Sequence, residues 1–482
     1  MSSRIIKNII QLITCTVFIT VCFSQTKSNA RMLGMGGAYS TVARGYNSVG
    51  INPANLAFNK TLQFGIPFLG NNVSFVNNMF SIETYNQLSG SNLEDINSED
   101  YYEKKDIFRL TKNEGLRFNL YNQMPIINIS KGIFAFNSDF ILISNFGVPE
   151  GFLDLLFNGI SADPDPAISD IGNDFNFDFK EDVLGVNEFA FSMGIPYENF
   201  GLGVTLKYLQ GLFYLGIDQD SSYATLKVDS TEVSGNGRIL FRQAIGGGGV
   251  GLDLGFITKR NDYGWKFGFS FINLMSKIHW NKPNITRNLL GETIESYMPY
   301  RQNEYFLYQY EIDNVSAESL FGQSGGIDSL FQTWSYTVVE DPDSGLIRAD
   351  TLLSVNLQER NLKDFTTQYP AFFRMGLSKL IEGQALFAVD VYTGFSDNYN
   401  SYSNWKFSFG TEIFKFKNII YRLGYSFGGN NSSDLSYGMG YVIGPFFGQK
   451  LDVDLALGFK NSIFINKAQG LDFSIGFTWT KQ

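Results

Sequence analysis

The chain has 482 residues, of which 47 are acidic and 37 basic, so its formal net charge is −10. An acidic chain of this kind is a poor partner for nucleic acid or anionic lipid. Aromatic residues form 16% of the chain, Gly is abundant at 49 residues, and the mean hydropathy is −0.07. No apolar run after the first 24 residues is long enough for a spanning helix. The composition suits a β-barrel, whose outer face is rich in aromatic residues and whose lumen is polar.

Residues 1–24 predict a secretory signal peptide. Arg4 and Lys7 form its positive start, and residues 9–23 are mostly apolar. This apolar stretch is shorter than the roughly 20 residues of a spanning helix. Both cysteines of the chain lie within the signal, so we expect no disulfide and no thiol chemistry in the mature protein.

The strand pattern begins after residue 60. Residues 61–80 predict a first hairpin, with Pro67 and the run Gly70-Asn71-Asn72 inside it. Residues 83–115 are polar and charged, which predicts a surface loop.

Later segments alternate between apolar and polar positions, the pattern of a strand with one oily face. In residues 470–479 every odd position is large and apolar, and every even position is small or polar. A stretch of about ten residues matches a tilted strand that crosses a bilayer. The same alternation occurs in residues 200–208, 263–271, 405–413 and 451–459.

If the apolar positions face lipid, the charged positions of the same strands must face the lumen. A charge on the lipid face at mid-depth costs up to about 4 kcal/mol. We therefore expect the following side chains to point inward: Lys207, Lys406, Glu412, Asp452, Asp454 and Asp472.

Short and long connections alternate along the chain. Tight turns are predicted at residues 196–199, 260–262, 381–383 and 415–418. Barrels place short turns on the periplasmic side and long loops outside. Residues 274–370 form the longest loop, which is expected to hold extra strands near residues 305–312 and 335–339.

One loop is predicted to contain a helix. Pro149 suits its first position, and Asn158-Gly159 suits its end. Phe152, Leu155 and Leu156 share one face of this helix. Two interpretations stand: the face forms a groove that captures a lipid-like ligand, or it packs on the barrel rim.

Little in the chain points to catalysis or metal binding. His279 is the only histidine and stands beside Trp280, so a rim position is favoured over a Ser-His-Asp site. Acidic residues crowd the loop between Asp163 and Asp182, but their spacing lacks the Gly and terminal Glu of an EF-hand. A solvated loop is therefore favoured over a calcium site. We expect no enzyme activity, no metal and no cofactor.

Residues 33–57 contain a Gly-x-Gly-Gly-Ala run followed by Asn-Pro-Ala. This segment resembles the start of the mature FadL-type family, the outer-membrane transporters of long-chain fatty acids and their relatives. Residues 370–391 and 421–456 resemble the PorV-like branch of that family, which serves type IX secretion. Residues 148–158 resemble a domain family of unknown function.

The FadL-type resemblance implies that residues 25–59 form a hatch, a plug folded inside the barrel. The residues that carry the hatch motif are Gly34, Gly36, Gly37, Asn52, Pro53 and Ala54. Glycines let a backbone pack closely against strands, and Asn-Pro favours a turn. The alternative is a Gly-rich leader loop with no gating role.

Together these observations predict an all-β fold, a transmembrane antiparallel β-barrel of about 14 strands with long extracellular loops. The barrel is expected over residues 60–482, behind the hatch. The rival fold is a soluble β-sandwich array, which more often shows turns about every 8–12 residues.

We expect a monomer in the outer membrane of a Gram-negative bacterium, in contact with outer-membrane lipid and not with nucleic acid. The leading function is passive uptake of hydrophobic, fatty-acid-like small molecules by a FadL-like mechanism. The alternative is a PorV-like adaptor that binds secreted protein cargo. A structural barrel without cargo is a third interpretation.

Overall fold

The computed structural model describes most of the chain after the predicted signal peptide. The described residues are 27–92, 95, 97–102, 111, 115–158, 174–176, 178–217, 222–228, 232–280, 305–316, 334–339, 365–395, 403–416, 418–429, 431–446 and 448–481. The signal peptide and the acidic residues of the loop up to Asp170 lie outside this set.

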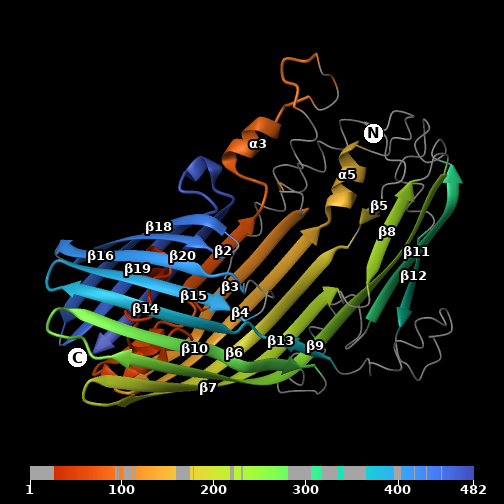
Figure 1. Cartoon of the computed structure of the whole chain (residues 1–482). Helices are drawn as coiled ribbons and strands as arrows, with labels where there is room; N and C mark the ends of the chain where they lie inside the picture. The colour runs from red at the N-terminus through yellow and green to blue at the C-terminus, as the bar shows by residue number, and fades with distance from the viewer. Residues whose placement is uncertain are drawn as a thin grey trace.

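Within the described residues, one antiparallel sheet closes into a barrel of 14 strands, which confirms the predicted fold class (Figure 1). The wall strands are β1 (Leu62–Gly65) with β2 (Asn71–Asn77), β3 (Leu116–Lys131), β4 (Phe134–Val148), β6 (Lys180–Pro196), β7 (Phe200–Ile217), β9 (Glu232–Thr258), β10 (Trp265–His279), β14 (Phe372–Ile381), β15 (Ala385–Gly394), β16 (Lys406–Phe416), β17 (Ile419–Gly428), β18 (Asn431–Phe446), β19 (Gln449–Lys460) and β20 (Gly470–Lys481). Each strand pairs with its neighbours along the chain, and β20 returns to β1 and β2.

Residues 61–80 do not form the predicted hairpin. β1 and β2 both pair with β20 on one side and with β3 on the other, so they are two parts of one wall strand. Gly65 lies opposite Thr478, whereas Asn71 lies opposite Ile475, and the residues between them bulge out of the ladder. We call residues 66–70 the wall break. Its proline has no backbone N–H to donate to the ladder, so the turn signal marks an interruption and not a reversal.

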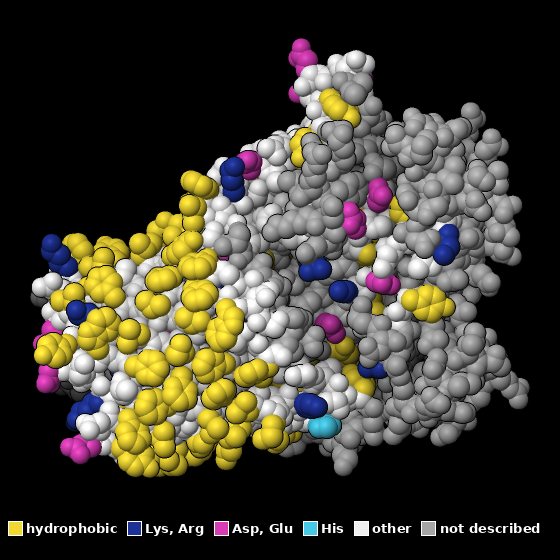
Figure 2. All heavy atoms as spheres, viewed as in Figure 1, with side chains coloured by type: hydrophobic (Ala, Val, Ile, Leu, Met, Phe, Trp, Pro, Cys, Tyr) yellow, Lys and Arg dark blue, Asp and Glu magenta, His cyan; other side chains and the backbone are white. Residues whose placement is uncertain are grey.

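The outward face of the wall is apolar, as the alternation predicts. In β20 the buried positions include Asp472, Ser474 and Thr480, whereas Leu471 on the opposite face is exposed. Hydrophobic side chains gather in a broad band over the half of the barrel near the short turns (Figure 2). A continuous apolar band of this kind is the lipid-facing surface of a transmembrane barrel.

The tight turns predicted between β6 and β7, β9 and β10, β14 and β15, and β16 and β17 are confirmed. They lie at one end of the barrel, together with the C-terminus (Figure 1). Since short turns mark the periplasmic side, this end faces the periplasm and the long connections face outward.

The outer end carries further strands: β5 (Asp174–Asn176), β8 (Tyr223–Val228), β11 (Tyr305–Ser316), β12 (Trp334–Val339) and β13 (Thr366–Gln368). β11 and β12 confirm the extra strands predicted within residues 274–370. β9 has 27 residues because it runs past the barrel to pair with both β8 and β11.

Helices are short. In chain order they are α2 (Ala30–Gly34), η1 (Gly45–Ser48), η2 (Pro53–Phe58), α3 (Ile82–Leu88), α5 (Glu150–Asn158) and η6 (Ile465–Lys467). Among the described residues, no helix combines the length and the apolar character that a membrane crossing requires. The predicted loop helix is confirmed as α5.

We expect a charge on the lipid face to destabilise the barrel in a depth-dependent way. Leu455 lies in the middle of β19 and is exposed, whereas Phe416 is exposed at the periplasmic end of β16. Leu455→Arg is expected to lower the free energy of unfolding by about 2–4 kcal/mol, and Phe416→Arg by about 0–1 kcal/mol. Denaturant titration in phospholipid vesicles measures both, and equal costs would contradict the assigned lipid face.

Candidate functional site

Residues 27–59 lie inside the barrel, and we call them the luminal segment. Its core side chains are fully buried: Met35, Tyr39, Ile51 and Leu56 are each no more than 1% exposed. The segment contains α2, η1 and η2, which touch strands on opposite sides of the wall. It therefore fills the lumen at the level of the lipid-facing band.

The predicted glycines of the luminal segment pack backbone against backbone. An added Cβ on Gly424 of β17 would lie 1.9 Å from the Gly36 nitrogen, and one on Gly34 would lie 2.9 Å from Gly438 Cα. Gly36 and Gly37 also have positive φ angles of 63° and 91°, which non-glycine residues rarely adopt. Position 37 thus requires glycine because of its backbone conformation. Positions 34 and 36 require glycine because the backbone there lies so close to the wall.

The Asn-Pro-Ala run meets the opposite wall in the same manner. The Asn52 side chain accepts a hydrogen bond from the Ala54 N–H at 3.1 Å, which caps η2, and donates one to the Phe256 carbonyl at 3.1 Å. Pro53 occupies the first position of η2, where no N–H is needed. A Cβ added to Gly203 of β7 would lie 2.1 Å from the Ala54 nitrogen.

Asp390 of β15 holds the bend after the glycine run. Its carboxylate accepts hydrogen bonds from the backbone N–H groups of Tyr39 at 3.0 Å and Ser40 at 2.7 Å. Arg374 lies 3.3 Å from the same carboxylate and donates to the Gly37 carbonyl at 2.8 Å. Three charge-assisted contacts thus anchor one short stretch of backbone.

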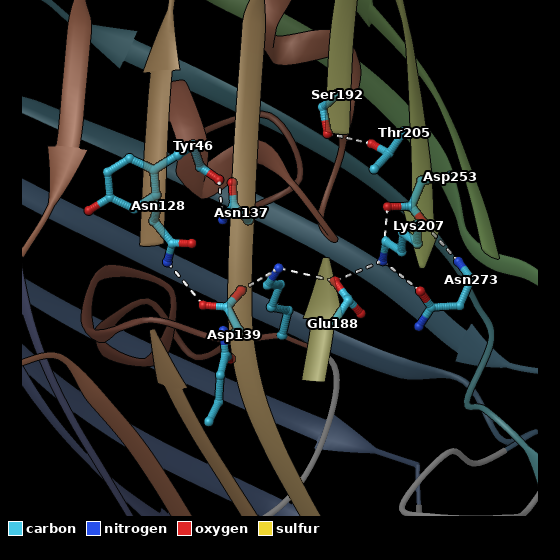
Figure 3. Close-up of polar contacts among 12 residues, drawn as sticks. Tyr46, Asn128, Asn137, Asp139, Glu188, Ser192, Thr205, Lys207, Asp253 and Asn273 are labelled. Atoms are coloured by element: carbon cyan, nitrogen blue, oxygen red, sulfur yellow. Dashed lines mark hydrogen bonds and ion pairs between the residues drawn. The ribbon is translucent and has the colours of Figure 1, made fainter. Parts of the chain in front are cut away.

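Lys27 anchors the start of the luminal segment to a chain of charges across four wall strands. Its ammonium pairs with Asp139 of β4 and with Glu188 of β6, the latter at 3.1 Å. Glu188 is shared with Lys207 of β7 at 3.5 Å, and Lys207 pairs with Asp253 of β9 at 3.1 Å. Figure 3 shows these wall side chains pointing toward one another across neighbouring strands. Burial disfavours the charge on Lys27, but the two carboxylates outweigh it and raise the pKa of Lys27.

Arg31 anchors α2 to the other side of the wall. It makes a bidentate ion pair with Glu412 of β16, with nitrogen–oxygen distances of 2.7 and 2.6 Å. Glu412 is shared with Arg422 at 2.7 Å, and Arg422 continues to Asp454 at 2.6 Å. Removing one partner of a buried pair of this kind costs about 3–5 kcal/mol.

The predicted inward charges are confirmed. Lys207, Glu412 and Asp454 belong to the two networks above. Lys406 pairs with the buried Asp434, and Asp472 pairs with Lys460 at 2.9 Å. Asp452 lies 3.4 Å from Lys450 and lines a luminal cavity.

Above the charge network the lumen becomes apolar. Toward the outer end of the barrel, the positions next to Asp139 in β4 and next to Glu188 in β6, on the same faces of these strands, carry aliphatic side chains. We call this buried set the outer luminal cluster: Tyr121, Ile141, Ile143, Leu184, Val186, Leu209, Tyr214, Ala244, Ile278, Trp280, Phe365 and Tyr369. Trp280 is fully buried at its centre, stacked 6.2 Å from Phe365.

The sequence carries a signal for the outer luminal cluster, but a search for alternating apolar and polar positions misses it. Where both faces of a strand are apolar, alternation is lost and consecutive apolar residues appear. Residues 140–143 form such a run, and residues 183–186 form another with one glycine in it.

A cavity of about 210 Å³ lies between the luminal segment and the wall on the periplasmic side. We call it the inner cavity. The wall break borders it, since Ile66 and Gly70 line it together with Pro125 of β3 and Gly476 of β20. Pro67 interrupts the wall strand beside this cavity.

The residues predicted to bind ligand on the loop helix are only partly described. The Phe152 ring of α5 makes an edge contact with the Phe179 ring at a centroid distance of 5.1 Å. The side chains of Leu155 and Leu156 lie outside the described set. The neighbouring Leu153 is buried against Met79 and Leu116. The described face of α5 therefore packs on the barrel rim.

The single histidine is not part of a catalytic arrangement in the described part of the chain. Its Nδ1 atom lies 3.2 Å from the Thr366 hydroxyl, at the outer end of β10. Among the residues that the structure places, no group of acidic, His or Cys side chains has the geometry of a metal site.

These features define a class of protein: a closed transmembrane β-barrel of the outer membrane, with its lumen occupied by its own N-terminal segment. A family model described as a family of unknown function (DUF5723) matches residues 53–324, and the chain belongs to this family. The match includes residues 148–158, the stretch whose sequence resembles such a family. No curated protein matches the sequence.

Several solved structures are similar over nearly their whole length. The Ralstonia pickettii toluene transporter TbuX matches with 12% identity and a TM-score of 0.45, covering 95% of this chain and 98% of its own. The Pseudomonas putida toluene transporter TodX matches with 11% identity and a TM-score of 0.44, covering 94% of this chain and 98% of its own. A Pseudomonas aeruginosa FadL homologue matches with 12% identity and a TM-score of 0.40, covering 95% of this chain and 98% of its own. At these identities and TM-scores the likeness carries no conclusion about a ligand of this chain.

We expect the close contact between wall and luminal segment to be essential for assembly. Gly424→Val places a side chain where the Gly36 backbone lies and should expel the luminal segment or prevent closure of the barrel. Gly476→Val is the matched control, because a Cβ there meets nothing within 4 Å. Protease cleavage within residues 27–59 and heat-dependent electrophoretic mobility measure the outcome. Equal behaviour of both variants would contradict the packing argument.

We expect the anchoring ion pairs to keep the lumen closed. Lys27→Met combined with Arg31→Met removes both anchors, and the conductance of the barrel in a planar bilayer should rise by about tenfold or more. Lys450→Met is the control, because its pair with Asp452 is partly exposed and such pairs contribute about 0–1 kcal/mol. Unchanged conductance of the double variant would show that backbone packing alone closes the lumen.

Proposed function

We propose that the protein mediates passive uptake of hydrophobic small molecules across the outer membrane. The outer luminal cluster is the observation that carries this proposal. It provides apolar side chains from β3, β4, β6, β7, β9 and β10 below the outer loops. Apolar side chains would not bind a polar solute. An apolar ligand, by contrast, gains about 0.8 kcal/mol for each CH₂ group that it buries among them.

The luminal segment is proposed to act as the hatch below this cluster. Gly34, Gly36, Gly37, Asn52, Pro53 and Ala54 would keep it packed on the wall, and Lys27 and Arg31 would lock it at two opposite strands. Release of these contacts, without ATP, would connect the outer luminal cluster with the inner cavity.

The wall break is the proposed exit toward the membrane. The regular ladder is interrupted over these five residues, which keep backbone hydrogen bonds from the Ile66 N–H to the Phe477 carbonyl and from the Phe68 N–H to the Pro125 carbonyl. An interrupted strand separates from its neighbours more easily than a continuous one. Phe68 and Leu69 of the wall break are 62% and 56% exposed, so an apolar ligand leaving the inner cavity would meet an apolar surface there.

An adaptor for secreted protein needs only an exposed partner surface. The outer luminal cluster would be superfluous in such a protein, so the geometry favours uptake. The ligand is expected to be a small apolar or amphiphilic molecule, such as a fatty acid.

We expect polar substitutions in the outer luminal cluster to block uptake. The double variant Ile143→Asn and Leu184→Asn places two amides among apolar side chains and should reduce uptake of radiolabelled myristic acid about tenfold, equivalent to about 1.4 kcal/mol. The measurement uses cells that lack their own long-chain fatty-acid transporter. Wild-type protein that gives no uptake of this or shorter apolar probes would overturn the proposal.

The same two strands supply a matched control. Leu142→Asn and Val183→Asn introduce identical amides on the opposite face of β4 and β6, beside the substituted positions. Normal uptake in this control, with a loss in the luminal variant, would assign the effect to the lumen.

A further inference from the structure

A second, larger hollow opens at the periplasmic end of the lumen. It has a volume of about 730 Å³ and lies between the luminal segment and two short turns of the wall. We call it the periplasmic cleft. Residues 41–44 and 57–59 of the luminal segment form one side together with Lys60, and residues 196–198 and 259–260 form the other. It lies away from the wall break and shares only Arg44 with the inner cavity.

The periplasmic cleft is lined by a concentration of positive charge. Its basic side chains are Arg44, Lys60, Lys259, Arg260 and Lys266, whereas Glu198 is the one carboxylate among the described residues that line it. Among the described residues, none of these five cations forms an ion pair. The chain as a whole has a formal net charge of −10, so this local excess runs against the composition.

Elsewhere in the described part of the lumen, the buried cations pair with carboxylates. Each basic side chain buried in the networks is matched by carboxylates, and the pairs lie between 2.6 and 3.5 Å for those of Arg31, Lys207, Arg374 and Arg422. Cations packed together without such partners repel one another, and this repulsion costs free energy unless an anion offsets it. A bound anion would offset this repulsion in the periplasmic cleft.

The cations of the periplasmic cleft are held in place by neutral groups. Lys266 donates to the Asn55 side chain at 2.8 Å. Arg260 donates to the Gly264 carbonyl and, at 3.5 Å, to the Ser378 hydroxyl. Arg44 is exposed to the hollow. The nearby positive charges of Arg31 and Arg260 lower the pKa of Arg44. These neutral contacts orient the donors, and none of them is made with a carboxylate.

Apolar side chains stand beside the charges. Phe58, Tyr197 and Leu386 line the same hollow. Pockets of about 300–1,000 Å³ suit small ligands, and an apolar wall with a few charged groups fixes the ligand's polar end. The combination fits a ligand with an anionic head.

We propose that the periplasmic cleft binds an oxyanion group, a phosphate or a carboxylate, either free in the periplasm or as the head of a single-chain amphiphile. Arg44, Arg260 and Lys266 would contact the oxyanion directly. This inference does not depend on the uptake proposal, since the site lies at the other end of the lumen and involves none of the outer luminal cluster.

The test is a calorimetric titration of the purified full-length barrel with inorganic phosphate and, separately, with dodecyl phosphate below its micellar concentration. Wild-type protein is expected to bind at least one of the two probes. Arg44→Gln combined with Lys266→Gln should weaken binding at least tenfold. Lys60→Gln combined with Lys259→Gln changes only exposed side chains, so it should fold normally and weaken binding by a smaller factor.

The matched control is Lys131→Gln combined with Lys415→Gln, which removes two exposed cations from the same periplasmic end but outside the cleft. Binding in this control should equal the wild type. Equal binding of both probes would identify a free oxyanion, and preference for dodecyl phosphate would identify an amphiphile. Absence of binding to both probes, or an equal loss in the control, would overturn the proposal.

Discussion

The close approach of the luminal segment to the wall is the constraint on which the rest of the structure depends. Gly203 and Gly424 touch backbone atoms of the segment at distances that leave no room for a Cβ atom. Main chains can approach this closely only where side chains are absent. Once the segment is seated, its buried groups need partners, and Asp390 supplies acceptors for two of its backbone N–H groups.

The charges of the lumen follow from the same constraint. A lysine and an arginine of the segment are buried in the barrel, and each is stable there because wall carboxylates surround it. Glu188 and Glu412 are each shared between one cation of the luminal segment and one of the wall, so the luminal segment and the wall form continuous networks. The lumen thereby divides into an apolar outer part, a neutralised middle and a cationic periplasmic end. The apolar outer part is the basis of the proposed uptake of an apolar molecule, and the cationic end is the basis of the proposed anion site.

Much of this architecture can be predicted from residues that are close in sequence. Alternation in residues 470–479 assigns the lipid and luminal faces of β20, and the tight turns orient the barrel. The inward position of Glu412 follows because lipid would not accept it. Prediction failed where a local signal has two meanings: Pro67 with Gly70 is compatible with a reversal or with a break. Only the pairing of β1 and β2 with the same two neighbours decides between them.

The sequence by itself determined the fold class and the faces of the strands, because these depend on the period of side chains along a strand. The expectation that residues 25–59 occupy the lumen came from the resemblance to the FadL-type family. The tertiary structure alone decided which charges pair, where the lumen turns apolar and which cations are left without a carboxylate. Lys27 and Glu188 are 161 positions apart, and Arg31 and Glu412 are 381 apart. Such contacts arise only when the barrel closes, since closure, and not local sequence, brings distant strands around the same segment.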